Sequence, residues 1–372
     1  MISWIAVIRL LAIIGKLSKE RFIYMIELTG KYNSCKIFTD TIDSSATGQL
    51  IALMNQEVVK ESKIRIMPDV TAGKGSTVGT TLTFTDKIIP NIVGSDIGCG
   101  ILCVKLKEKR IDLPKFDSVV NNNIPSGADI NKGSKESKTS VNIEDLRCYK
   151  TIAAKENYCY KSIGTLGGGN HFIELDKDTD GNLYLLIHSG SRNLGTLVCD
   201  YYQKVAFEEC KENNIPFELS YVSGIPCNNY LHDMKMVQKF AKDNRFEIAR
   251  VIMKMAKLHE VESFDTIHNY VNVANHIIRK GAISAQDGEK VIIPMNMRDG
   301  ALICIGKGNP DWNYSAPHGA GRLLSRSDAK QTLGMKDFKE SMKGIYSTSI
   351  HSSTLDESPM VYKPMDEIVD KI

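Results

Sequence analysis

The chain alternates between stretches of helical and of extended periodicity. Apolar residues in Ser45–Val59 (SATGQLIALMNQEVV) have helical spacing, so the pattern predicts a helix there. A longer helix is predicted over Asp233–Val261, where apolar residues recur at threes, fours and one longer step. The methionine-rich stripe of this second helix indicates packing in the core.

Extended patterns separate these helical ones. Ile64–Leu106 mixes β-branched and apolar residues with glycine turns and predicts several strands, and Gly288–Gly308 predicts strand and turn. Leu183–Arg192 is an apolar run that predicts a buried strand with a histidine at its end. Asn131–Asp145 is polar and charged, which is typical of an exposed loop. Without repeats or a linker, the pattern predicts one α+β domain with mixed or antiparallel sheets and flanking helices.

The first 24 residues differ from the rest. Ile2–Gly15 is apolar apart from Arg9, but it is shorter than the ~20 residues that span a bilayer. Basic residues follow this run rather than precede it, unlike in a secretory signal. We expect residues 1–24 to be an atypical leader, either extraneous or a short helix on the body. Residues 25–372, from Met25 onward, should form the folded domain, and no membrane association is predicted.

Composition indicates what the protein can bind and in which cellular compartment it works. The 372 residues include 47 basic and 44 acidic ones, so any nucleic-acid binding must come from a local basic surface. Between Arg279 and Lys343 there is a mild excess of this kind, 11 basic residues against 7 acidic ones. Nine cysteines without a CxxC pair, in a chain too long to need disulfides, indicate a reducing, cytoplasmic location.

The sequence VGSDIGCG (Val93–Gly100) places a carboxylate and a thiol three residues apart. In a regular strand Asp96 and Cys99 would point to opposite faces. The glycines around them, at positions 94, 98 and 100, allow a bend that brings both to one side. Two interpretations follow from these residues: a pair of ligands, or a small buried cysteine at a strand end.

Three histidines extend the set of potential donors. His171 follows three glycines and an asparagine, His188 ends a predicted strand, and His268 precedes Asn269. Each alone is more often a structural, hydrogen-bonded histidine. Together with Asp96 and Cys99 they suit one or two divalent metals, because imidazole, thiolate and carboxylate all donate electron pairs. Their wide spacing is unlike a zinc finger and favours a catalytic site.

A fourth histidine has different neighbours. In YSAPHGAGRLLSR (Tyr314–Arg326), His318 precedes Gly-Ala-Gly, and Arg322 follows four residues later. The glycines let backbone N–H groups approach an anion, and a helix starting there would add its dipole. Arg322 can bind a phosphate through two parallel hydrogen bonds. His318 is thus a candidate nucleophile or general acid/base, although a helix-starting turn with a surface histidine fits the same pattern.

These motifs together resemble the RtcB family of RNA-splicing ligases. The resemblance runs from about Met25 to the C-terminus, and the PHGAGRLLSR motif is its most specific part. It is carried, in order, by MPDVTAGKG, VGSDIGCG, GTLGGGNHF, LIHSGSRNLG, HNYVNVANH, IPMNMRDG and PHGAGRLLSR. The resemblance implies the α+β fold of that family, and a cytoplasmic enzyme of RNA repair or tRNA splicing.

The resemblance also implies a reaction. The family joins RNA 2′,3′-cyclic phosphate or 3′-phosphate ends to 5′-hydroxyl ends with GTP and manganese. By this resemblance His318 attacks the α-phosphate of GTP and forms a histidine–GMP intermediate, from which GMP passes to the RNA 3′-phosphate. The residues that match the family's metal ligands, with the cysteine shared between two Mn²⁺ ions, are Asp96, Cys99, His171, His188 and His268. Those that match positions near the guanylate are Asn170, Glu174, Asn269, Ala320, Gly321 and Arg322.

Some features depart from the family or leave alternatives open. Thr71 stands where the family usually has histidine. The chain stops at Ile372, so we expect a shortened C-terminal tail. In this tail, Lys371 is not taken as the equivalent of the family's terminal lysine. Ligand softness alone would favour zinc, whereas the carboxylate and phosphate oxygens favour a harder ion. The alternatives to a ligase are a catalytically lapsed relative that binds RNA ends and a metal-dependent phosphoesterase.

Overall fold

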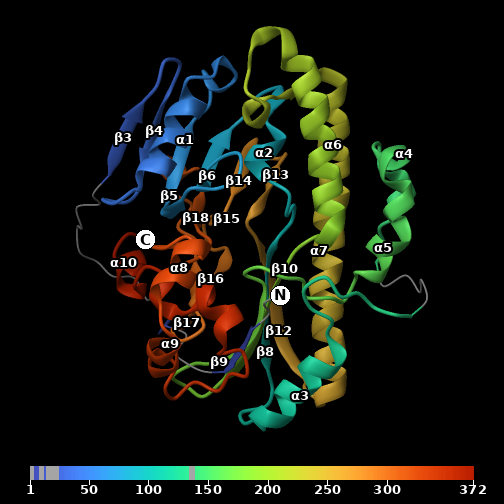
Figure 1. The fold of residues 1–372 in the computed structure, drawn as a ribbon, viewed down its shortest axis with the longest axis vertical. Coiled ribbons are helices and arrows are strands. Elements are labelled where there is room, and N and C mark those ends of the chain that lie inside the picture. Colours follow the sequence, from blue (N-terminus) through green and yellow to red (C-terminus); the bar gives the residue numbers. More distant parts are fainter. Residues whose placement is uncertain (1–3, 8–11, 14–24, 134–138) are drawn as a thin grey trace.

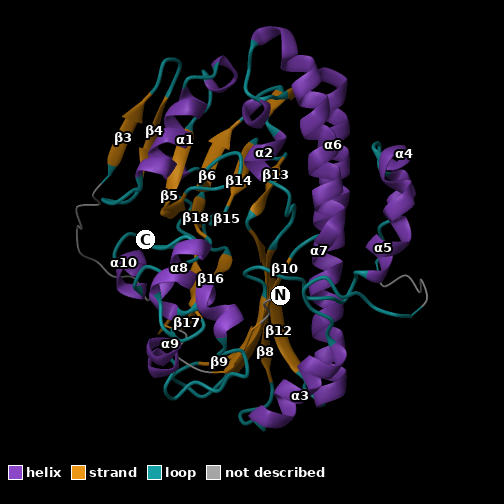
Figure 2. Ribbon diagram, viewed as in Figure 1, coloured by secondary structure: helices purple, strands orange, loops and turns teal. Residues whose placement is uncertain are grey.

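The computed structural model describes residues 4–7, 12–13, 25–133 and 139–372. It confirms the predicted α+β class: several mixed or antiparallel sheets are flanked by helices (Figures 1 and 2). The two largest sheets lie one above the other in the view of Figure 1, and the long helices α6 and α7 run along one side of both. The candidate site lies where these two sheets and the C-terminal strands meet.

The upper sheet has six strands in the order β13-β14-β6-β5-β4-β3. It is antiparallel except for the pair β4–β5, which is parallel. Helices α1, α2, α6 and α7 pack against it and share with it the largest apolar cluster. Its strands are β3 (Ile26–Thr29), β4 (Ser34–Ile37), β5 (Ile64–Thr71), β6 (Val78–Thr83), β13 (Asn269–Asn272) and β14 (Ile277–Lys280).

The lower sheet has five strands in the order β1-β9-β10-β8-β12, and alternate residues on them point to opposite faces. Leu102 and Leu185 pack on α3 and α7, whereas Cys103 and Leu186 pack on β16, β17 and α9. Both faces are therefore buried, which explains the nearly continuous apolar run in β10. The strands are β1 (Trp4–Val7), β9 (Phe172–Lys177), β10 (Leu183–Ser189), β8 (Gly100–Leu106) and β12 (Glu260–Ile267).

Three smaller sheets complete the fold. The hairpin of β16 (Lys290–Asn296) and β17 (Gly300–Ile305) confirms the strands predicted between Gly288 and Gly308, and it is extended by β2 (Ala12–Ile13). The pair β15 (Ala282–Ser284) and β18 (Ser315–Pro317) leads directly into His318. The remaining pair is β7 (Lys87–Ile88) and β11 (Val222–Ser223).

Both predicted helices are present with shifted ends, and the other helices of the described residues, the 19-residue α6 among them, were not predicted. The first predicted helix is α1 (Ser44–Met54), which begins after the N-cap Asp43, and residues Glu57–Val59 form a separate 3-10 turn. The remaining helices are α2 (Pro90–Val93), α3 (Leu113–Asn123), α4 (Tyr149–Ile152), α5 (Glu156–Lys161), α6 (Arg192–Cys210), α7 (Gly224–Ala256), α8 (Arg326–Thr332), α9 (Met335–Ser341) and α10 (Met365–Val369). The segment Asn131–Asp145 is a loop over its described residues, apart from a 3-10 turn at Ile143–Asp145. Its predicted exposure is wrong for Val141 and Ile143, which pack into the main apolar cluster.

The end predicted for the long helix is wrong. Helix α7 stops at Ala256, because Lys257 adopts the left-handed conformation with φ 54° and the Leu258 N–H bonds back to the Met253 carbonyl. Val261 already belongs to β12. Leu258 nevertheless packs into the same apolar cluster as the helix, so the apolar periodicity continues after the helical backbone has ended.

The leader forms strands where it is described. Trp4–Val7 pairs in parallel with β9, and Ala12–Ile13 pairs in parallel with β17. The alternative of a short helix is therefore wrong for these residues, and the rest of residues 1–24 lies outside the described part of the chain.

Candidate active site

The segment between α2 and β8 bends as its glycines suggested. Gly94 and Gly98 have φ of 88° and 72°, and the Cys99 N–H donates to the Asp96 carbonyl at 3.1 Å. A Cβ on Gly98 would lie 2.8 Å from the Cα of Gln238 in α7, so only glycine fits there. The bend brings the side chains of Asp96 and Cys99 to the same neighbour, His171.

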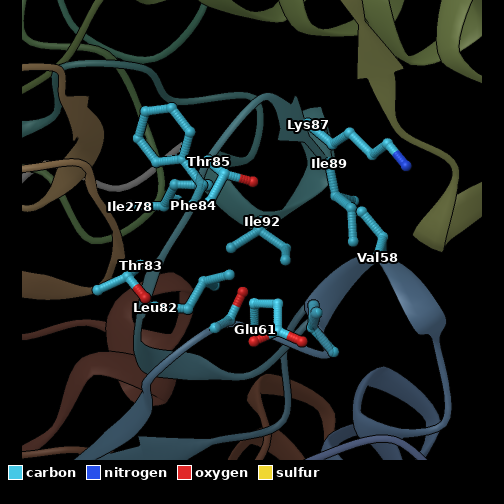
Figure 3. A pocket seen from close by; sticks show the side chains of 12 residues that line it. Val58, Glu61, Leu82, Thr83, Phe84, Thr85, Lys87, Ile89, Ile92 and Ile278 are labelled. Carbon is cyan, nitrogen blue, oxygen red and sulfur yellow. The ribbon is translucent and has the colours of Figure 1, made fainter.

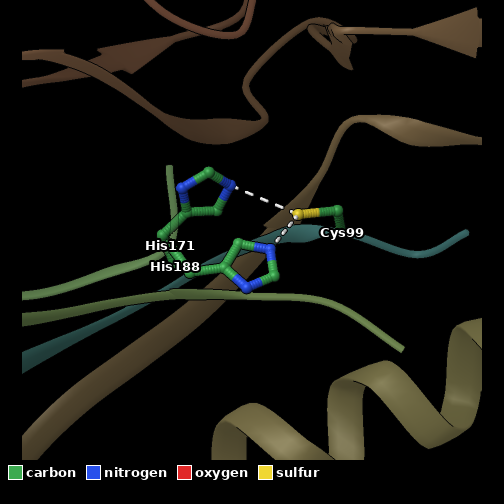
Figure 4. Close-up of side chains that lie close together, drawn as sticks. All are labelled: Cys99, His171 and His188. Carbon is green, nitrogen blue, oxygen red and sulfur yellow. Dashed lines mark hydrogen bonds between the residues drawn. The ribbon is translucent and has the colours of Figure 1, made fainter. Parts of the chain in front are cut away.

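Cys99, His171 and His188 form a buried group suited to a metal ion (Figure 4). The Cys99 Sγ lies 3.5 Å from Nε2 of His171 and 3.3 Å from Nε2 of His188, and the three ligand atoms lie within 4.8 Å of one another. The Asp96 Oδ2 lies 3.0 Å from the same Nε2 of His171. Sulfur, imidazole nitrogen and carboxylate oxygen all converge, so the donor set fits a divalent transition metal.

Backbone carbonyls fix the orientation of the two imidazoles. Nδ1 of His171 lies 2.9 Å from the Leu166 carbonyl, and Nδ1 of His188 lies 3.1 Å from the Asn170 carbonyl. A carbonyl only accepts, so each Nδ1 carries the proton, and in the neutral ring each Nε2 directs its lone pair toward Cys99. This is the arrangement in which histidines bind metals, with the second nitrogen held by an outer partner.

Burial sets the protonation of the group. It lowers the pKa of His188 and His268 well below the usual range of histidine, and neighbouring imidazoles add to the effect, so both rings are neutral at pH 7. Burial and then the Asp96 charge raise the pKa of the Cys99 thiol well above its usual range. A metal that binds Cys99 as thiolate must therefore displace its proton.

A series of imidazoles connects this group to His318. The ring centroids are 5.2 Å apart between His171 and His188, 5.2 Å between His188 and His268, and 4.7 Å between His268 and His318. His268 follows β12, and its N–H bonds to the Cys99 carbonyl at 2.9 Å. The fold thus brings together all four histidines that the sequence indicated.

The residue that orients His318 is Asp69, which the sequence analysis missed. The Asp69 Oδ2 accepts from Nδ1 of His318 at 2.6 Å and from its backbone N–H at 3.0 Å. Asp69 is fully buried in β5, whereas the His318 side chain is 18% exposed. Because the carboxylate holds the proton on Nδ1, the Nε2 lone pair is available for attack, as in catalytic Asp–His pairs. Asp69 is visible in the sequence as the aspartate of MPDVT, but no local pattern pairs it with His318.

Two buried polar residues of α7 hold the loops of the metal group, and the sequence analysis missed these too. The Arg245 guanidinium forms two hydrogen bonds with Asp265, at 2.6 and 2.8 Å. Its NH1 also donates to the carbonyls of Gly98 and Ser189, next to two metal-group residues. Asn244 contributes further hydrogen bonds to backbone on either side of the group. The long helix therefore fixes site geometry as well as filling the core.

Three of the candidate guanylate residues have different surroundings in the structure. The Asn170 side chain is exposed, and only its carbonyl meets His188. Asn269 lies at the site, where its Oδ1 accepts from the Gly281 N–H and its Nδ2 donates to the Asp96 carbonyl. Glu174 is buried at 2% exposure beside Asp176, and burial together with that carboxylate raises the pKa of Glu174 well above its usual range.

The other three lie on the loop after His318. Ala320 is buried, and Gly321 has φ 77°, where a Cβ would lie 2.8 Å from the Asp69 carbonyl oxygen. Helix α8 begins only at Arg326, so the helix start expected directly after the glycines is absent from this described loop. The Arg322 guanidinium contacts the C-terminal segment through the Asp356 carbonyl and the Tyr362 hydroxyl.

A small cavity elsewhere contains none of these residues. It encloses about 20 Å³ between β6, α2 and the turn after α1, and Figure 3 shows its lining of apolar and polar side chains, Leu82, Ile92 and Glu61 among them. This volume holds about one water molecule.

No helix in the described part of the chain combines the length and the apolar character that crossing a bilayer requires.

The fold and the site together define a class: an α+β protein with a buried Cys–His–His metal group beside an aspartate-oriented histidine. The family model described as "tRNA-splicing ligase RtcB" matches residues 49–372, and the chain belongs to the RtcB family. It is 31% identical to "RNA-splicing ligase RtcB1" of Escherichia coli, over 88% of this chain and 90% of that protein. It is 28% identical to "tRNA-splicing ligase RtcB" of Aeropyrum pernix, over 82% of each chain.

Proposed function

We propose that this protein is an RNA ligase that joins 2′,3′-cyclic phosphate or 3′-phosphate ends to 5′-hydroxyl ends in RNA repair or tRNA splicing. The relatives named above carry RNA-splicing or tRNA-splicing ligase as their names. The observation that carries the proposal is the Asp69–His318 pair, because the carboxylate holds Nδ1 of a partly exposed histidine and leaves its Nε2 free of that contact, adjacent to the metal group.

In the proposed reaction His318 is the nucleophile and GTP the co-substrate. Nε2 forms a bond to the α-phosphorus, and the bond to the pyrophosphate oxygen breaks, so that pyrophosphate leaves. Asp69 stabilises the positive charge that develops on the imidazole during attack. A 2′,3′-cyclic phosphate end is first opened by water, which breaks the bond from phosphorus to O2′ and gives a 3′-phosphate. The bond from Nε2 to phosphorus then breaks as GMP passes to the 3′-phosphate, and the 5′-hydroxyl attacks that phosphate and displaces GMP. Asn170, Glu174, Asn269, Ala320, Gly321 and Arg322 are proposed to surround the guanylate.

For the metal we propose two manganese ions held by Asp96, Cys99, His171, His188 and His268, with Cys99 shared. The support is the convergence of Cys99, His171 and His188 and the adjacent Asp96 carboxylate, a harder ligand than sulfur. When bound, such ions supply positive charge for the phosphate oxygens. We also propose a cytoplasmic location. The support is that all nine cysteines are free thiols, as is usual in a reducing compartment.

The test is a joining assay with two RNA fragments, one ending in a 2′,3′-cyclic phosphate and one beginning with a 5′-hydroxyl. We expect a joined product that requires both GTP and Mn²⁺, with Zn²⁺ compared side by side. Release of inorganic phosphate from 3′-phosphate RNA without GTP would favour a phosphoesterase. Binding of RNA ends with neither product would favour a catalytically lapsed relative.

A further inference from the structure

The loop that follows His318 has no regular secondary structure until α8 begins at Arg326. Its position must therefore come from tertiary contacts. One side is held by β5, through the Asp69–His318 hydrogen bonds and the tight approach of Gly321 to Asp69. A loop held on one side only would leave the direction of the His318 ring poorly defined.

The other side is held by the C-terminal segment Asp356–Lys363. Arg322 and Tyr362 form an antiparallel bridge. The Leu323 N–H donates to the Val361 carbonyl at 2.7 Å, and the Lys363 N–H donates to the Gly321 carbonyl at 3.0 Å. These bonds align the loop with the segment as in a short two-stranded ribbon.

Two buried carboxylates stand at the centre of this contact. The side chains of Asp356 and Glu357 are 1% and 0% exposed. Glu357 accepts from the Tyr362 hydroxyl, pairs with the guanidinium of Arg326 and lies 3.6 Å from NH1 of Arg322. Charges buried this completely require partners, and removing the Glu357 carboxylate takes away a negative charge that faces both Arg322 and Arg326.

Arg322 uses its guanidinium within this contact. Nε donates to the Leu324 carbonyl at 3.1 Å, NH2 to the Asp356 carbonyl at 2.6 Å and NH1 to the Tyr362 hydroxyl at 3.4 Å. The guanidinium also lies 5.3 Å from the centre of the Tyr362 ring. Its role in the structure is thus to join the loop to the C-terminal segment.

The same segment reaches the other member of the catalytic pair. The Lys363 ammonium is buried and donates to the Pro68 carbonyl at 3.0 Å, directly before Asp69. The segment therefore contacts backbone on both sides of the Asp69–His318 hydrogen bond. A shift of this segment would change the distance between carboxylate and imidazole.

We propose that Glu357, together with Tyr362, is a positioning residue for the nucleophile: it holds the loop Gly319–Ser325 so that Nε2 of His318 points at the reacting phosphate. This inference rests on the proposed guanylation of His318. The C-terminal segment is thereby part of the catalytic apparatus. Geometric errors of about 1 Å at a reacting group cost on the order of a hundredfold in rate.

The test compares Glu357→Gln, Tyr362→Phe and the control Glu340→Gln in the full chain. Glu340 is a surface residue of α9, 66% exposed and paired with Lys343. For Glu357→Gln we expect single-turnover guanylation to slow by about a hundredfold with little change in the KM for GTP, because positioning acts on the chemical step. Tyr362→Phe keeps the ring and removes one hydroxyl, so it should fold and slow the step by a smaller factor.

Amide hydrogen exchange provides a readout that does not depend on activity. Peptides covering residues 319–325 should exchange faster in Glu357→Gln and Tyr362→Phe than in wild type, and unchanged in Glu340→Gln. Wild-type rates in both variants, with unchanged exchange, would overturn the positioning role while leaving the proposed function intact. Absence of guanylation in the wild type would instead overturn the proposed function, and the positioning role with it.

Discussion

The carboxylate of Asp69 lies 2.6 Å from Nδ1 of His318, although 249 residues separate them in the chain. The first stands on β5 and the second directly after β18, and the fold brings the ends of these strands together. We expect Asp69→Asn to slow guanylation by about 10²- to 10⁴-fold, because an amide no longer holds the proton on Nδ1. Single-turnover labelling with GTP measures this, with the exposed Asp86→Asn as control. A loss of less than tenfold would contradict the orienting role.

The thiol of Cys99 lies within 3.5 Å of Nε2 of both His171 and His188. Cys99→Ser should reduce the metal content of the purified protein and its affinity for Mn²⁺ by at least about tenfold, because a hydroxyl is a much poorer ligand than a thiolate. Titration calorimetry and elemental analysis measure both quantities. Cys304→Ser, on β17 and outside the group, is the matched control and should bind as wild type.

Metal binding should release a proton from Cys99. The pKa of this thiol is raised by burial, so it is protonated at neutral pH, and binding as thiolate becomes easier as pH rises toward that pKa. Affinity should therefore increase with pH, by up to about tenfold per unit. His188 and His268 are already neutral and add no protons between pH 6 and 8. Calorimetry in buffers of different ionisation enthalpy counts the protons, and a pH-independent affinity would argue against a thiolate ligand.

Arg245 contributes both to the stability of the fold and to the geometry of the metal group. Arg245→Leu should lower the free energy of unfolding by about 3–5 kcal/mol, because it leaves the Asp265 carboxylate buried without its partner. The control on the same helix is Lys239→Leu, whose side chain is 54% exposed and whose partner Asp243 is itself 20% exposed, so that the pair should contribute less than about 1 kcal/mol. Denaturant unfolding measures both. Metal affinity should fall only in the first variant, since NH1 of Arg245 holds backbone beside Cys99 and His188.

Much of the site was predictable because its residues carry local signals. Glycines around Cys99 indicated the bend, and the residues beside His171, His188 and His318 marked them as candidates. The pairing of Asp69 with His318 was not predictable, since it depends on how two distant strands meet. The contact of the Arg322 guanidinium with the C-terminal segment was likewise not predictable, because it joins residues 34 positions apart that carry no local signal for each other.

The fold, like the site, was predictable only in part. Periodicity predicted α1, α7 and several strands, but the end of α7 depended on the backbone conformation of Lys257, which an apolar pattern does not encode. Likewise, Asn244 and Arg245 looked like ordinary polar positions of a helix, and their burial follows only from the loops packed against them.

The central claim is that His318 becomes covalently guanylated. Protein incubated with Mn²⁺ and GTP labelled in the α-phosphate should carry the label through an acid-labile, alkali-stable bond, and peptide mass spectrometry should place GMP on His318. His318→Ala should accept no label while retaining bound metal. Label that persists in His318→Ala, or that maps to another residue, would contradict the account.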